Sequence, residues 1–141
     1  MKNDTLKMIV LSTLMVSPLM AEADLVVVSS IQNPLSSLTI KQVAHIFLGQ
    51  ARAFPNGDKA TPINQTENSV IYNEFYTTMT GKEATLLKVY WSRMIFTGKG
   101  RPPLEVQNDE MVKKLLINDA SAIGYINKSA IDHNIKVLLA P

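Results

Sequence analysis

Short apolar runs of strand type alternate with helical segments along this chain, and this alternation restricts its fold more than any other feature. Residues 25–28 read Leu-Val-Val-Val, and such a β-branched run is typical of a strand that is buried on both faces. Further strands are expected at residues 60–64, 122–126 and 135–139. Strands that are separated by helices need crossover connections, which favour a mainly parallel sheet. The sequence therefore predicts an α/β fold.

Residues 38–49 contain the signals for a complete helix with both of its ends. Thr39 can cap the first turn through its hydroxyl, and the side chain of Gln42 can accept a hydrogen bond from the Thr39 N–H, which is the pairing of a capping box. Gly49 supplies a residue that tolerates the left-handed conformation at the helix end. Three further helices are expected to begin after Ser69, at Lys82 or Glu83, and after Asn108.

Residues 1–21 have the pattern of a secretory signal peptide. Two lysines form a basic start, an apolar run occupies residues 8–16, and small residues follow. The apolar run is too short to span a bilayer. We expect cleavage after Ala21, with Ala23 as the alternative, and export to the periplasm.

Residues 22–141 are predicted to form one exported domain. Removing Lys2, Lys7 and Asp4 from the total leaves 12 basic and 11 acidic residues, a net charge of +1. This balance gives no support for a nucleic-acid partner. The chain has no cysteine, so the domain must be stabilised by packing without disulfides.

No motif for catalysis, metal binding or cofactor binding is found. The two histidines, His45 and His133, lack the spacing of a metal site. There is no Gly-x-Ser-x-Gly elbow, P-loop or dinucleotide fingerprint. The adjacent acids Asp109 and Glu110 suit the start of a helix better than acid–base chemistry. We therefore expect a protein that is not an enzyme and needs no cofactor or metal.

Three segments carry recognisable motifs. Residues 38–49 read LTIKQVAHIFLG and match the pattern Leu-Thr-x-x-Gln-Leu-x-x-Ile-Phe-x-Gly closely, and residues 122–126 contain Ala-Ile-Gly-Tyr. Residues 91–103 read WSRMIFTGKGRPP. Together these segments resemble periplasmic phosphate-binding proteins, the substrate receptors of ABC importers, and residues 91–103 are similar to a motif of small stand-alone relatives of those receptors. The usual receptor has two lobes, so the resemblance implies a single lobe, with a mainly parallel sheet of about four or five strands and about four helices.

The resemblance also indicates where a ligand would bind, and where this chain departs from the family. Phosphate-binding proteins carry Arg-x-x-Gly-Ser-Gly-Thr at the helix that corresponds to residues 64–75. Here Asn64 or Gln65 stands near the position of the arginine, and Glu67 puts a negative charge where an anion would lie. Phosphate specificity is therefore not implied by the motif as it stands.

Thr66, Asn68 and Ser69 are the main candidate ligand residues. Free N–H groups at a helix start, with hydroxyl and amide donors beside them, suit an oxyanion. The alternative is that Asn68 or Ser69 only caps the helix.

Other candidate residues come from two more distant segments. Ser29 and Ser30 follow the first strand, at the carboxyl end of a sheet where ligands collect in α/β proteins. Arg101 lies in a loop rich in glycine and proline and could supply positive charge. The alternative meanings are ordinary loop serines and a solvated basic turn.

Two functions are compatible with these features. In the first, the chain is a periplasmic solute-binding protein that binds phosphate or a similar oxyanion weakly and serves a membrane transporter. A single lobe leaves its ligand exposed on one side, so tight binding would need a second surface, from self-association or from another protein. In the second, the same lobe is a protein-interaction or sensory accessory module, whose partner is a porin or a sensor ectodomain.

Overall fold

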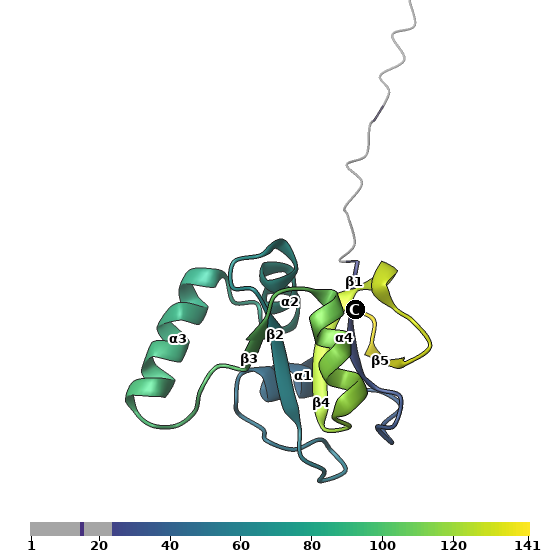
Figure 1. Ribbon diagram of the computed structural model, residues 1–141. Helices are drawn as coiled ribbons and strands as arrows, with labels where there is room; N and C mark the ends of the chain where they lie inside the picture. Colours follow the sequence, from purple (N-terminus) through teal and green to yellow (C-terminus); the bar gives the residue numbers. More distant parts are fainter. Residues whose placement is uncertain (1–14, 16–23) are drawn as a thin grey trace, which may run out of the picture.

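The computed structural model describes Met15 and residues 24–141. The expected signal peptide and its two cleavage sites fall outside the described residues, apart from Met15. Residues 24–141 form a layered α/β domain in which a five-stranded sheet lies between helices (Figure 1). None of the helices in this described part combines the length and the apolar character that crossing a membrane requires.

The described part of the chain follows the predicted order of strands and helices. In sequence, its elements are β1 (Leu25–Ser30), α1 (Ile40–Phe47), β2 (Thr61–Gln65), α2 (Val70–Thr80), α3 (Ala84–Phe96), β3 (Leu104–Val106), α4 (Asp109–Asn118), β4 (Ala122–Asn127), the 3-10 helix η1 (Lys128–Ala130) and β5 (Ile135–Leu139). The capping box expected at Thr39 and Gln42 is present at the start of α1. Strand β3 was not predicted, because three residues are too few for an alternating pattern.

The sheet has the strand order β3-β2-β4-β1-β5. Strand β2 pairs parallel with β3 and β4, whereas β1 pairs antiparallel with β4 and β5. Four of the five strands therefore point the same way, as the expected mainly parallel sheet requires, and β1 alone runs in reverse. As a result, the carboxyl end of β1 lies beside the amino end of β4, at the opposite end of the sheet from the carboxyl ends of β2 and β4.

Helices α1 and α2 pack on one face of the sheet, over a cluster of aromatic side chains. The ring of Phe75 is stacked on that of Tyr125, with centroids 3.9 Å apart and planes 6° apart. Phe47 meets Phe75 edge-on at 4.6 Å, and Tyr76 meets it edge-on at 5.1 Å. All four side chains are fully buried. This cluster joins both helices to β4.

Helix α4 covers the opposite face, and Gly124 explains how closely it packs there (Figure 1). A glycine inside a strand allows another backbone or a ligand to approach closely. The neighbour is Val112 of α4: a Cβ built on Gly124 would lie only 2.6 Å from the Val112 Cγ1. The glycine therefore serves helix packing, and the Val112 side chain occupies the space beside it.

Helix α3 lies apart from the two packed faces (Figure 1). Only Leu87 and Trp91 of this helix are buried, while Phe96 is 92% exposed. Apolar side chains at Leu86 and Val89 are also exposed. Two surface cavities lie between α3, the loop that follows it, and the rest of the domain.

Candidate anion-binding site

The predicted ligand residues form a tight turn between β2 and α2. Asn68 adopts the left-handed conformation, with φ of 65°, which asparagine tolerates better than most residues. The Ser69 N–H donates to the Thr66 carbonyl over 3.0 Å, and the Ser69 hydroxyl accepts from the N–H of Tyr72 over 3.3 Å. Ser69 therefore caps α2, as the alternative interpretation predicted.

Capping by Ser69 leaves part of the helix start available for a ligand. The first N–H groups of a helix have no partner within it, and Ser69 satisfies the one on Tyr72. The amides of Val70 and Ile71 donate to no backbone carbonyl among the described residues. Val70 is 82% exposed, whereas Ile71 is buried, so the Val70 amide is the more accessible donor. Capping and anion binding are thus compatible at this turn.

The two residues near the expected arginine position have structural roles. The Asn64 side-chain oxygen accepts hydrogen bonds from the hydroxyls of Tyr76, at 2.8 Å, and Tyr125, at 3.3 Å. The Gln65 amide nitrogen donates to Asp109 at 2.7 Å and to the Tyr125 carbonyl at 2.9 Å. Both side chains are buried. Neither replaces the arginine as a ligand for an anion.

Burial keeps the tyrosines of this region protonated. It raises the pKa of Tyr76 well above its ordinary value and raises that of Tyr125 as well, mainly through desolvation of the charged form. The pKa of Tyr72 is raised by burial first and then by the nearby carboxylates of Glu67 and Glu105. Negative charge is therefore concentrated beside Tyr72.

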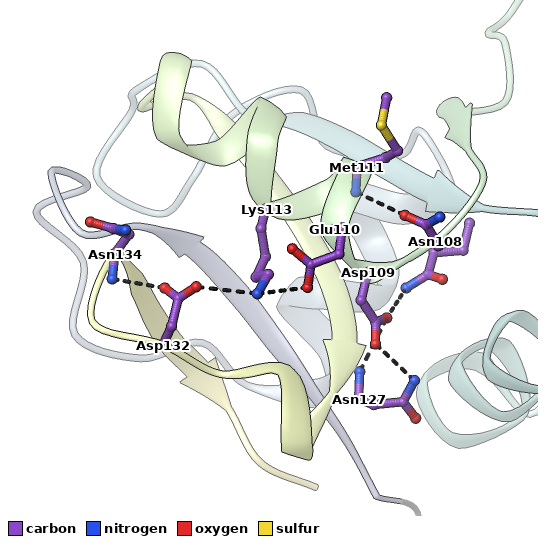
Figure 2. A network of polar contacts seen from close by, with 9 residues as sticks. Asn108, Asp109, Glu110, Met111, Lys113, Asn127, Asp132 and Asn134 are labelled. Atoms are coloured by element: carbon purple, nitrogen blue, oxygen red, sulfur yellow. Dashed lines mark hydrogen bonds and ion pairs between the residues drawn. The ribbon is translucent and has the colours of Figure 1, made fainter.

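Asp109 connects the carboxyl ends of two strands to the start of α4, and sequence reasoning did not find this role (Figure 2). Besides Gln65, its carboxylate accepts hydrogen bonds from the Asn127 N–H at 3.3 Å and the Asn127 side-chain amide at 2.9 Å. These partners lie 44 and 18 residues away along the chain. No local spacing rule connects residues at such separations, so only the fold reveals the contact.

Replacing Asp109 by asparagine should lower the free energy of unfolding by about 1–3 kcal/mol, since one acceptor oxygen becomes a donor that faces other donors. Urea denaturation of the purified chain measures this loss. Glu110→Gln is the matched control, because the Glu110 side chain is 76% exposed and forms a local i,i+3 ion pair with Lys113, which keeps its second partner Asp132. Equal stability of the two variants would contradict the role of Asp109.

A small hollow lies beside the start of α2. Its volume is about 180 Å³, and the polar residues in its wall include Glu67, Glu105, Lys88, Asn64 and Ser92. Trp91 also lines it, and the buried indole N–H of Trp91 has no hydrogen-bond partner among the described residues. An unpaired buried donor is costly, so an acceptor oxygen in this region would be favoured.

The other predicted ligand residues lie elsewhere. Ser29 and Ser30 are buried within β1, and Ser29 pairs with Ile123 near the beginning of β4. Because β1 runs against its neighbours, these serines lie at the opposite sheet edge from the α2 start. Arg101 borders a different cavity. The fold therefore does not gather Ser29, Ser30 and Arg101 around Thr66, Asn68 and Ser69.

The histidines lie on separate elements. His45 is half-buried on α1, and His133 is exposed in the segment before β5. Within residues 24–141, no group of three or more histidine, aspartate or glutamate side chains is placed to hold a metal ion.

Solved structures of known proteins share this architecture. No family model matches the chain, and no curated protein sequence matches it. An ABC-type phosphate transport receptor from Vibrio cholerae matches it in structure, with a TM-score of 0.64 and 21% identity, over 82% of this chain and 45% of that one. The fold is that of a phosphate-binding-protein lobe.

Two further structures have the same fold. A putative phosphate ABC transporter substrate-binding protein from Clostridium perfringens, with bound phosphate, gives a TM-score of 0.65 and 18% identity, over 82% of this chain and 44% of that one. PstS from Borrelia burgdorferi gives a TM-score of 0.55 and 16% identity, over 82% of this chain and 46% of that one. The chain thus spans less than half the length of each of these proteins, as expected for a single lobe.

Proposed function

We propose that this chain is an exported, non-enzymatic binding protein that holds phosphate or a similar oxyanion weakly at the start of α2, in the periplasm. The observation that carries this proposal is the turn of residues 66–69, which leads from the end of β2 directly into α2. It does so in a fold shared with a substrate-binding protein that contains bound phosphate.

The donors at this turn support an anion of modest affinity. The amides of Val70 and Ile71, the partial positive charge of the helix start and the side-chain amide of Asn68 all favour negative charge. The Thr66 hydroxyl donates to the Gln107 carbonyl over 3.3 Å, so its hydrogen must leave that carbonyl before it can bind an anion. The helix terminus contributes about 0.3–2 kcal/mol, and each charge-assisted hydrogen bond roughly 1.5–3 kcal/mol. An association cost of at least about 4 kcal/mol leaves a dissociation constant in the millimolar range.

The acidic wall of the adjacent hollow lowers the affinity further. Glu67 and Glu105 outnumber Lys88 among the charged residues that line it. Tight capture therefore requires a second surface that brings positive charge and excludes water, from a transporter component or a second copy of the chain.

The main experiment exploits the two helix caps. Ser69→Asp keeps a good N-cap at α2 but puts a negative charge where the oxyanion would lie. Thr39→Asp makes the same charge change at the cap of α1, which begins beside β5. Isothermal titration with phosphate and sulfate should show weak binding to the original chain and to Thr39→Asp, and none to Ser69→Asp.

The absence of any heat for the original chain, with no change in melting temperature at tens of millimolar anion, would refute the proposal. Equal anion binding by both aspartate variants would show that the anion binds somewhere other than the start of α2. Comparable melting temperatures of the two variants without anion serve as the folding control.

Glu67→Gln should strengthen phosphate binding by about fivefold, because removing one like charge near the anion relieves roughly 1 kcal/mol of repulsion in a water-exposed setting. Titration calorimetry at low ionic strength measures the change. Glu83→Gln, which removes an exposed carboxylate from the start of α3, should leave the affinity unchanged. Weaker binding after Glu67→Gln would show that this carboxylate contacts the ligand favourably.

A further inference from the structure

A second and larger cavity lies at the other end of β2. Its volume is about 650 Å³, within the range of small-molecule sites. Its walls come from the end of α1, the loop before β2, and the loop that follows α3. Apolar side chains dominate the lining, with Ile46, Ala60, Pro62 and Ile95 among them.

The charged residues of this lining are two arginines, Arg52 and Arg101, and no acidic residue lines the cavity. Within the described part of the chain, neither guanidinium forms an ion pair; the ion pairs found there both involve Lys113. Both side chains are exposed, so they remain hydrated while the cavity is empty. Their positive charge is therefore available to a bound anion.

A backbone hydrogen bond holds Arg52, and an ordered turn precedes Arg101. The Ala60 N–H donates to the Arg52 carbonyl over 3.0 Å, which fixes the loop before β2. On the other side, Gly98 ends α3 in the left-handed conformation, and the Lys99 N–H donates to the Met94 carbonyl over 2.9 Å. Arg101 follows this turn closely. Two separate segments thus present one arginine each to the same cavity.

We propose that this cavity binds an organic carboxylate with an apolar body. Guanidinium groups match the planar carboxylate geometry and form paired hydrogen bonds with it. The carboxylate would lie between Arg52 and Arg101, and the hydrocarbon part would pack on Ile46, Pro62 and Ile95. An inorganic oxyanion would leave these apolar walls in contact with water. This site is independent of the turn at the start of α2.

Octanoate is the probe, with 1-octanol as its neutral counterpart. Trp91, the only tryptophan of the chain, reports on binding, because its ring packs against Gly49 in the cavity wall. The same ring also lines the hollow beside α2, so the arginine variants and Ser69→Asp assign the signal to one of the two sites. Titration of the purified chain with octanoate should change the tryptophan fluorescence saturably and release or absorb heat. The affinity for 1-octanol should be at least about tenfold weaker.

Arg52→Gln and Arg101→Gln should each weaken octanoate binding by about tenfold, the loss of one charge-assisted hydrogen bond. Arg93→Gln is the matched control, because it removes an exposed arginine of α3 that does not line the cavity. Ser69→Asp should also leave octanoate binding intact, which separates this site from the phosphate site. Equal binding of octanol, unchanged affinity in both arginine variants, or no fluorescence change and no heat with octanoate would overturn the proposal.

Discussion

Phe75→Ala is expected to lower the free energy of unfolding by about 3–5 kcal/mol, the largest loss that we predict for a single substitution in this chain. Phe75 is fully buried, and its ring contacts those of Tyr125 and Phe47. Truncation removes the stacked contact to β4 and the edge contact to α1 at once. The cavity that remains adds its own cost, because the surrounding rings belong to three different elements and cannot all move inward.

Urea denaturation of the purified chain measures this effect. Phe96→Ala is the matched control: the same atoms are removed from a ring that is 92% exposed, so the change should stay within about 0.5 kcal/mol. A loss below about 1 kcal/mol for Phe75→Ala would mean that the aromatic cluster does not stabilise the packing of α1 and α2 on the sheet.

Gly124→Ala is expected to cost about 1–3 kcal/mol, because the added methyl group would overlap the side chain of Val112. The distance of 2.6 Å between the new Cβ and the Val112 Cγ1 is shorter than real contacts allow. Helix α4 must then move away from β4, and the loss acts on the sheet face opposite to the aromatic cluster. Thermal or urea unfolding measures it.

A double-mutant cycle isolates the cause of this loss. Val112→Ala alone should destabilise by removing buried methyl groups, whereas Val112→Ala combined with Gly124→Ala should cost clearly less than the sum of the two single changes. Additive losses would indicate that Gly124 is required for its backbone conformation and not for helix packing.

Local sequence determined the helices of this protein and most of their ends. Thr39 with Gln42, and Asn108, act as the predicted caps, and Gly81 ends α2 in the left-handed conformation. The positions of these helix ends depend on hydrogen bonds and dihedral preferences among residues that are close in the chain, so they can be predicted from the sequence alone. The likeness of residues 38–49 to phosphate-binding proteins belongs to the same local level, and the fold confirmed it.

Only the tertiary structure decided the direction of β1, and with it the position of Ser29 and Ser30. A buried apolar strand can form its backbone hydrogen bonds whether it runs parallel or antiparallel to its neighbours. The residues of β1 therefore do not predict the direction of the strand. The same holds for Gln65 and Asp109, whose contact joins residues far apart in the chain. Contacts of this kind arise when whole helices and strands pack together. The same packing places Ser29, Ser30 and Arg101 away from the start of α2, where the sequence had predicted them to be.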